Sequence, residues 1–205
     1  EILSLLKLLL KKVELPKNTN INFFNKDFLS YTFKNSYDLV IGNPPFGKIK
    51  DKKVLNEYKK HGINIHNNLF TLFLNKSLNL SKNVALVLPK SFISSPEHDQ
   101  IRSKIEKKNI FSILDFGEYG FKGVKIETIG LILNGRKIND NKVKSYSYAN
   151  KKYLLQNQDY IIDSKFPYWL LYRNKFFDQV CKKMEFGVFN FFRDRQITKK
   201  HTLNK

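Results

Sequence analysis

The chain has 205 residues, of which 41% are hydrophobic, and a formal net charge of +19 at pH 7. This length and composition fit one α/β domain. The excess of basic residues favours a polyanionic partner, most simply nucleic acid. A coding bias toward lysine on solvated faces accounts for part of that excess. No segment approaches the roughly 20 apolar residues of a membrane span, and the single cysteine, Cys181, excludes a disulfide framework or a cysteine-based zinc site and fits a reducing cytoplasm.

The N-terminal part of the chain carries two periodic segments. Residues 2–10 place leucines at helical spacing and end before two lysines, which predicts a helix with a basic carboxyl end. Residues 20–25 alternate apolar and polar side chains and predict a strand. Asp27 and Phe28 follow directly, at a position where an aspartate most often serves as a turn or helix cap.

The rest of the chain is organised around residues 38–47. Within them, residues 39–41 form a short apolar run that predicts a buried parallel strand. The following Gly-Asn-Pro-Pro stops this strand, because proline cannot continue a sheet ladder and restricts the residue before it to extended backbone. We therefore expect a rigid corner at the carboxyl end of a strand, where open α/β sheets hold ligands.

The groups at this corner suit a planar amino group. An amine conjugated to a purine or a carbonyl is a poor nucleophile, because its lone pair is delocalised. The side-chain oxygen of Asn43 and the carbonyl oxygen of Pro44 can each accept one of its N–H bonds, which localises the lone pair and stabilises the transition state by roughly a few kcal/mol. Phe46 stacking on a nucleobase would contribute about 1–3 kcal/mol. The alternative is a turn that uses Asn and Pro only as turn formers.

Later segments alternate between strands and helices. Residues 48–60 are charged and predict a loop or an exposed helix, whereas residues 68–78 carry an apolar stripe that predicts a core helix. The remaining predicted elements are strands at 84–89, 110–116, 126–133 and 143–148, and a helix that begins at Ser95-Pro96 and runs through Ile105.

Two further stretches offer groups for binding. Glycines frame an exposed loop with Phe121 and Lys125 before the strand at 126–133, and an ordinary hairpin whose Phe returns to the core is the alternative. Near the end of the chain, basic side chains alternate with Phe and Gln, a composition that suits phosphate and base contacts but also fits a simple basic tail. The basic residues of this stretch are Arg193, Arg195, Lys199 and Lys200.

Asn43-Pro44-Pro45-Phe46 after an apolar strand resembles the catalytic motif of S-adenosylmethionine-dependent amino-methyltransferases, which methylate adenine N6 in DNA or a glutamine amide in protein. The loop with Phe121 resembles the late motif of γ-order adenine-N6 DNA methyltransferases of type II restriction–modification systems, which extrude their target base. The resemblance implies three groups of site residues: catalytic Asn43, Pro44, Pro45 and Phe46; cofactor-binding Asp27, Phe28 and Asn43; and DNA-binding Phe121, Lys125, Arg193, Arg195, Lys199 and Lys200.

The resemblance also implies the architecture. We expect an α/β, Rossmann-like, mostly parallel sheet of which this chain holds the C-terminal part. On this interpretation, residues 1–148 form a partial methyltransferase domain, residues 149–185 a helical linker and residues 186–205 the start of a target-recognition region.

A glycine-rich strand–turn–helix loop, which holds the methionine moiety of S-adenosylmethionine in such enzymes, is missing from the sequence. The chain begins with Glu1 and has no cleavable signal pattern. We therefore expect an internal fragment with an incomplete cofactor site, which acts on double-stranded DNA only with the remainder of the enzyme. Two alternatives stay open: a protein glutamine-N5 methyltransferase, and an inactive truncated fragment that needs a partner chain.

Overall fold

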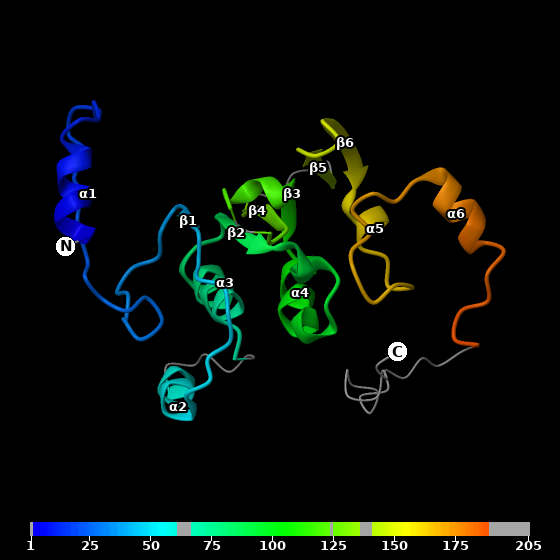
Figure 1. Ribbon diagram of the computed structural model, residues 1–205, viewed down its shortest axis with the longest axis horizontal. Helices are drawn as coiled ribbons and strands as arrows, with labels where there is room; N and C mark the ends of the chain where they lie inside the picture. The colour runs from blue at the N-terminus through cyan, green and yellow to red at the C-terminus, as the bar shows by residue number, and fades with distance from the viewer. Residues whose placement is uncertain (1, 61–66, 124, 136–140, 189–205) are drawn as a thin grey trace, which may run out of the picture. The chain divides into compact units, whose positions relative to one another are not determined.

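The computed structural model describes residues 2–60, 67–123, 125–135 and 141–188 (Figure 1). The chain divides into two compact units, Glu1–Leu170 and Leu171–Lys205, and the second contains α6 (Lys175–Cys181). The helices of the first unit are α1 (Ile2–Leu10), α2 (Lys52–Lys60), α3 (Leu69–Leu80), α4 (Asp99–Glu106) and α5 (Gln158–Ile161), with single 3₁₀ turns η1 (Lys90–Ile93), η2 (Pro96–His98) and η3 (Glu118–Gly120). Its strands are β1 (Val40–Gly42), β2 (Val84–Pro89), β3 (Asn109–Gly117), β4 (Thr128–Asn134), β5 (Lys142–Ser147) and β6 (Lys152–Asn157).

The strands of the first unit form one sheet in the order β1-β2-β4-β3-β5-β6. β1 is parallel to β2 and β3 is parallel to β5, whereas β4 lies antiparallel between β2 and β3, and β6 is antiparallel to β5. Four strands therefore run in the same direction: β1, β2, β3 and β5. Their carboxyl ends lie at one edge of the sheet, the edge at which the antiparallel strand β4 begins. The α/β fold with a mostly parallel sheet predicted from the sequence is confirmed.

The core lies between the sheet and the helices α3 and α4. Side chains of β2 alternate between buried and half-buried positions, as expected for a strand with one face on a core. α3 packs against β2 and α4 against β3, and Figure 1 shows both helices on the same side of the sheet. The predicted core helix is confirmed, because its apolar stripe is buried; each such leucine contributes about 1.5–3 kcal/mol. The fully buried apolar residues of this layer include Leu74, Leu88, Ile101, Ile105, Ile110 and Ile113, whereas Leu72 of α3 packs in a separate cluster with Leu29.

β1 is more exposed than its apolar sequence suggests. Its parallel pairing with β2 is confirmed, but Ile41 is 76% exposed and the preceding Leu39 is 53% exposed, so the prediction of a buried strand is wrong. The physical reason is that β1 is the last strand of the sheet within the described residues and pairs on one side only. Residues 20–25 supply no neighbour: they are irregular, and the prediction of a strand there is also wrong. Their Ile21 and Phe24 point into solvent, so the alternating pattern matches no sheet face.

The sheet continues beyond the last strand predicted from the sequence. β6 pairs with β5 in antiparallel register, with Tyr153 opposite Tyr146, inside the segment that the sequence suggests as a linker. Its sequence gives no alternation of apolar and polar residues, because the apolar residues 153–155 are consecutive and most side chains of the strand are exposed. The charged residues after the Asn-Pro-Pro corner form the exposed helix α2, one of the two predicted outcomes.

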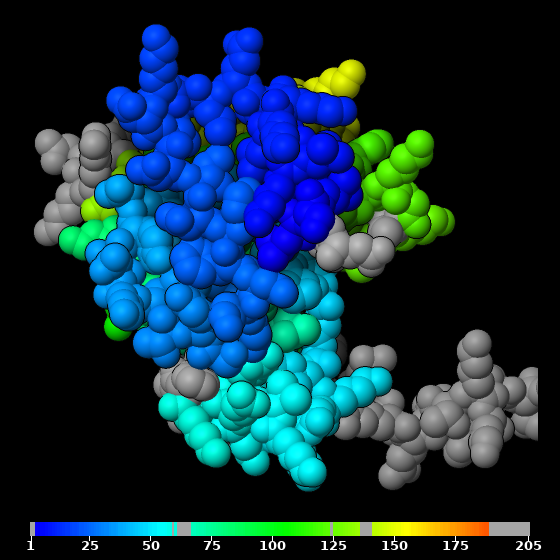
Figure 2. Space-filling model, turned by 90° about the vertical axis from the view of Figure 1, so that its left-hand side faces the viewer, coloured from blue at the N-terminus to red at the C-terminus, as the bar shows by residue number. Residues whose placement is uncertain are grey.

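Figure 2 looks onto the face formed by the first 60 or so residues of the chain. Several leucines of α1 are exposed, among them Leu5 and Leu8, as is Ile41 of β1. No helix in the described ranges has the length and apolar character required to cross a membrane.

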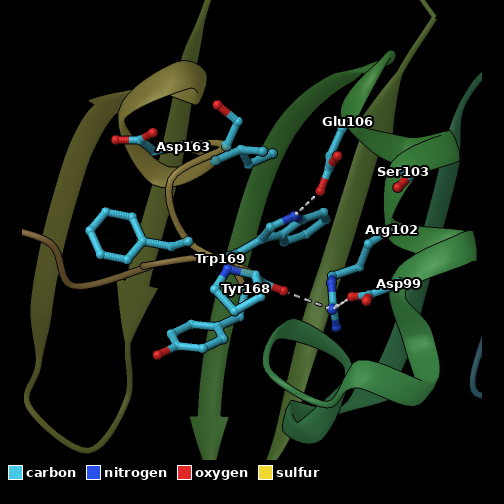
Figure 3. Close-up of a pocket in the computed structure, with 11 residues that line it drawn as sticks. Asp99, Arg102, Ser103, Glu106, Asp163, Tyr168 and Trp169 are labelled. Carbon is cyan, nitrogen blue, oxygen red and sulfur yellow. Dashed lines mark hydrogen bonds and ion pairs between the residues drawn. The ribbon is translucent and has the colours of Figure 1, made fainter. Parts of the chain in front are cut away.

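A buried arginine joins α4 to the segment that follows α5 (Figure 3). The Arg102 side chain is 2% exposed, and the indole N–H of Trp169 donates to the Glu106 carboxylate at 2.9 Å beside it. A cavity of about 340 Å³ adjoins these contacts, but its arginine and glutamate already have protein partners, so we interpret the cluster as structural. The Arg102 guanidinium donates to the carbonyl oxygens of Phe92 (2.8 Å), Ser95 (2.7 Å) and Pro167 (3.1 Å), and to the carboxylate of Asp99.

We expect Arg102→Met to lower the free energy of unfolding by about 3 kcal/mol, because the substitution leaves three carbonyl oxygens in or near the core without their charged donor. Urea unfolding followed by circular dichroism measures this change. The control is Lys104→Met on the same helix, whose side chain is exposed and makes one hydrogen bond to Asn75. Equal unfolding midpoints for the two variants would contradict the structural role of Arg102.

Candidate active site

The Asn-Pro-Pro corner follows β1 at the edge of the sheet where the parallel strands end. Gly42, the last residue of β1, lies opposite Leu86 of β2, which fixes the direction in which the chain leaves the sheet. Pro44 is buried, whereas Asn43 and Pro45 are exposed and Phe46 is half-buried. The buried proline holds the corner against the protein, and the amide side chain before it remains accessible.

A cleft of about 380 Å³ opens at this corner. One wall comes from the corner itself, and the other comes from the loop between β3 and β4, which contributes Phe121 and Ile126. The structure thus brings together all four residues of the corner motif and the aromatic residue of the glycine-framed loop, which are more than 70 residues apart in the chain. The lining residues are Asn43, Pro44, Pro45, Phe46, Phe121 and Ile126.

The two phenylalanine rings of the cleft touch each other. The ring centroids of Phe46 and Phe121 are 6.1 Å apart and their planes meet at 82°, an edge-to-face contact. A planar base between two rings needs parallel planes separated by two van der Waals contacts of about 3.5 Å each. The rings in this structure are neither parallel nor that far apart, so they must rotate or separate before a base enters between them.

Phe46 is also fixed from behind by the core. Its ring makes an edge-to-face contact with Phe70 of α3, with centroids 6.4 Å apart, and Phe70 is 1% exposed. The backbone after the corner is held as well, because the Leu69 N–H donates to the Gly47 carbonyl at 2.8 Å and Lys48 pairs with Glu97 at 2.6 Å. Of the two rings, Phe46 is therefore the one built on the rigid part of the domain.

The backbone of the loop that carries Phe121 depends on three glycines. Gly117 and Gly123 have positive φ angles of 56° and 79°, which side chains rarely adopt. A Cβ atom on Gly120 would overlap the hydroxyl of Thr128, the first residue of β4. The loop therefore packs tightly at its base, next to the strand that returns into the sheet.

Asp27 and Phe28 lie in a different environment. The Asp27 carboxylate accepts the Leu29 N–H at 3.1 Å and also hydrogen-bonds to the hydroxyls of Ser30 and Tyr58; although burial opposes the shift, these bonds hold its pKa below the ordinary value. The Phe28 ring stacks on Phe73 with centroids 4.9 Å apart. The structure gives no contact between these two residues and the cleft, and their assignment to the cofactor stays a prediction.

A lysine of α3 fixes this second region. The ammonium group of Lys76 donates to the carbonyl oxygens of Leu29 and Tyr31, both at 2.7 Å, and lies 5.6 Å from the centre of the Phe28 ring. Burial lowers the pKa of Lys76, and the Asp27 carboxylate partly opposes that shift. The sequence contains no pattern that assigns this role to Lys76.

The remaining predicted DNA-binding residues are less constrained. Lys125 is exposed, between Phe121 and Ile126 of the cleft wall. Residues Arg193, Arg195, Lys199 and Lys200 lie outside the described residues. Sequence reasoning missed Ile126 as a lining residue, since it counted this isoleucine as the start of a strand; β4 begins two residues later, at Thr128.

Comparisons with known proteins identify the family of this chain. Residues 3–121, more than half of the chain, match the family described as the Eco57I restriction-modification methylase. The chain is 32% identical over 165 residues to the type II methyltransferase M.AccI of Acinetobacter calcoaceticus, and 30% identical over 118 residues to the type II methyltransferase M.VspI of a Vibrio species. These alignments cover 74% and 55% of this chain but only 30% and 29% of the relatives, so the chain spans less than a third of their length.

A solved structure resembles the fold. The methyltransferase subunit of a type I restriction–modification system from Streptococcus thermophilus matches 72% of this chain and 41% of that subunit, with a TM-score of 0.52 at 14% identity. At this identity the match concerns the fold alone. The family match over residues 3–121 shows that the chain belongs to the Eco57I restriction-modification methylase family.

Proposed function

We propose that this chain is part of the catalytic domain of a site-specific DNA adenine-N6 methyltransferase of a restriction–modification system. The observation that carries the proposal is the cleft at the end of β1, where an exposed asparagine, two prolines and two aromatic rings meet. Family membership supports methyl transfer, and the chemistry of the cleft supports an amino nitrogen of a planar ring as the acceptor.

The corner supplies the activating groups. The Asn43 amide oxygen and the Pro44 carbonyl oxygen accept the two N–H bonds of adenine N6, which draws the nitrogen toward tetrahedral geometry and frees its lone pair for attack on a methyl group. Because Pro44 is buried and proline restricts the backbone before it, both acceptors are positioned before the substrate arrives. Pro45 keeps the chain from folding back over them.

The aromatic rings supply the site for the extruded base. Phe46, which rests on Phe70, forms the fixed side, and Phe121 on the β3–β4 loop forms the movable side. Stacking of the base contributes about 1–3 kcal/mol, enough to offset part of the cost of removing it from the duplex. We assign a phosphate contact to Lys125, which is exposed and precedes Ile126 of the cleft wall. We assign further contacts with double-stranded DNA to Arg193, Arg195, Lys199 and Lys200 in a target-recognition region that starts near residue 186.

S-adenosylmethionine would supply the methyl group as a sulfonium, whose positive charge makes the methyl carbon electrophilic. The Asp27 carboxylate could accept the adenine amino group of this cofactor, which would then replace a donor that it holds in this structure, such as the hydroxyl of Tyr58. We assign Asp27, Phe28 and Asn43 to cofactor binding, with Phe28 packing on the adenine ring.

The whole activity requires more protein than this chain. β1 has an unpaired edge in the described part of the sheet, with Ile41 largely exposed, and an apolar strand edge of this kind normally pairs with another strand. We propose that further strands of the catalytic domain, in the same protein or in a partner chain, cover this edge and bring the cofactor loop. Residues 149–185 would then connect the catalytic domain to target recognition.

A second candidate is methylation of a protein glutamine, whose side-chain amide is also a planar conjugated amine. The corner suits both substrates, but a glutamine side chain has no ring for Phe121 to stack on and no phosphates to attract a chain of net charge +19. Methyl transfer to duplex DNA compared with transfer to a release-factor-like protein separates the two candidates.

We expect Asn43→Ala, in a protein that carries this chain with its cofactor loop, to lower the methyl-transfer rate by a factor on the order of 10²–10³, because one of two acceptors for the amino hydrogens is lost. DNA affinity should stay within twofold, since phosphate contacts dominate it. Incorporation of labelled methyl groups into duplex DNA measures the rate. The control is Asn35→Ala, an exposed asparagine away from the lining of the cleft. An unchanged rate in Asn43→Ala would refute the assignment.

We expect the Tyr58 phenol to lose its proton at a higher pH than an ordinary tyrosine. Burial and then its hydrogen bond to Asp27 raise the pKa of Tyr58 to about 12 from an ordinary value of 10.0. The folded chain holds this proton more tightly than the unfolded chain, so the contribution to stability is complete below pH 10 and is lost as the pH rises through about 12. The difference in tyrosinate absorbance between the wild type and Tyr58→Phe measures this pKa.

The Asp27→Asn variant provides the control for this titration. It removes the negative charge but keeps the burial, so the pKa of Tyr58 should fall while remaining above the ordinary value. In the complete enzyme, binding of S-adenosylmethionine should lower the pKa of Tyr58 if the cofactor's amino group replaces the phenol at Asp27. A pKa that responds neither to Asp27→Asn nor to the cofactor would argue against this assignment.

A further inference from the structure

One lysine connects three elements at the edge of the sheet that holds the cleft. Lys90 is the first residue after β2, and its ammonium group lies 3.1 Å from Asp115 of β3 and 3.2 Å from Glu127, the residue before β4. The Lys90 backbone N–H also donates to the Glu127 carbonyl at 2.9 Å. The two carboxylates therefore meet at one cation: Asp115 comes from β3, and Glu127 directly precedes β4, the strand that lies between β2 and β3.

The two halves of this cluster differ in burial. The Asp115 side chain is 5% exposed and its other oxygen accepts the Gly117 N–H at 3.0 Å, so it forms a fixed base for the lysine. The Glu127 side chain is 56% exposed, so its link to Lys90 is the weaker one. Burial alone would lower the pKa of Lys90, but hydrogen bonds and attraction from Asp115 and then Glu127 raise it above the ordinary value, and the lysine is charged throughout the neutral range.

The exposed end of the cluster belongs to the movable wall of the cleft. Glu127 directly follows Ile126, which lines the cleft, and ends the loop that presents Phe121. The loop meets the sheet through the close approach of Gly120 to Thr128 and through the two contacts between Lys90 and Glu127. The hydrogen bond from the Lys90 backbone N–H to the Glu127 carbonyl remains when either side chain is changed. Loss of the Lys90 ammonium group therefore loosens the loop but does not detach it from the sheet.

We propose that Lys90 is a positioning residue: held by Asp115, it fixes Glu127 and thereby keeps Phe121 opposite Phe46 at the mouth of the cleft. It touches neither base nor methyl donor, and it acts through the position of the loop. The effect of Lys90 on methyl transfer rests on the proposed function. Its effect on the position of the Phe121 ring does not.

The position of the Phe121 ring can be measured directly with 4-fluorophenylalanine incorporated at residue 121 and ¹⁹F NMR. In the wild type, the edge-to-face contact displaces the signal from its free value, and Phe46→Leu abolishes that displacement. We expect Glu127→Gln to lose at least half of the displacement and Lys90→Arg, which keeps the charge, to retain most of it. Lys90→Met removes the cation beside the buried Asp115 carboxylate and endangers folding, whereas Glu127→Gln changes an exposed side chain and remains informative. An unchanged signal in a folded Glu127→Gln variant would overturn the proposal.

The consequence for the reaction is tested in the complete enzyme. We expect Glu127→Gln to lower kcat by about tenfold, the effect of weakening one base–ring stack, and to leave KM for DNA within twofold, because phosphate contacts set that affinity. The Lys90→Arg variant, which keeps the positive charge, should have a kcat within about twofold of the wild type. The matched control is Glu118→Gln, which changes an exposed glutamate at the other end of the loop. A wild-type enzyme that transfers no methyl group to DNA would defeat the proposed function alone. Full activity of Glu127→Gln beside a shifted fluorine signal would defeat the role of Lys90 in the reaction.

Discussion

The parallel pairing of β1 with β2 is the constraint on which the site depends. Three residues of β1, ending at Gly42, set the place and direction in which the chain leaves the sheet, and the buried Pro44 fixes the backbone of the corner. A side-chain amide and a main-chain carbonyl become useful acceptors only when their relative position is set before the substrate binds. Here that position is set by backbone geometry, and Asn43 itself stays exposed.

The second wall of the cleft results from strand direction. β4 lies antiparallel between β2 and β3, so the β3–β4 connection must lie at the same edge as the carboxyl end of β1. This topology brings Phe121 to Phe46 across a long stretch of sequence, and Lys90 lies at that edge for the same reason, because it directly follows β2. Strand order alone therefore places a motif, an aromatic ring and a charged cluster together.

Much of this arrangement could be predicted from sequence, and the failures have physical causes. The apolar runs of β2, β3 and β4 identify strands because they are buried, and the Gly-Asn-Pro-Pro stop identifies the corner because proline restricts the backbone locally. Residues 20–25 alternate as a strand does, yet no neighbouring strand pairs with them in the described ranges. β6 shows no alternation that would predict a strand, because its apolar residues 153–155 are consecutive and most of its side chains are exposed. The contacts of Lys76 and Lys90 depend on the tertiary fold, which single-residue patterns do not encode.

The contact between the two cleft rings decides how such a site can work. An edge-to-face pair at 6.1 Å is a favourable arrangement for both rings while no base is present. Entry of a base exchanges that contact for two stacking contacts, so the cost of opening is offset only when a planar ring takes its place. Phe46 cannot move far, since Phe70 and the core support it. Opening therefore falls to the loop with Phe121, and the link between Lys90 and Glu127 keeps the ring on that loop opposite Phe46.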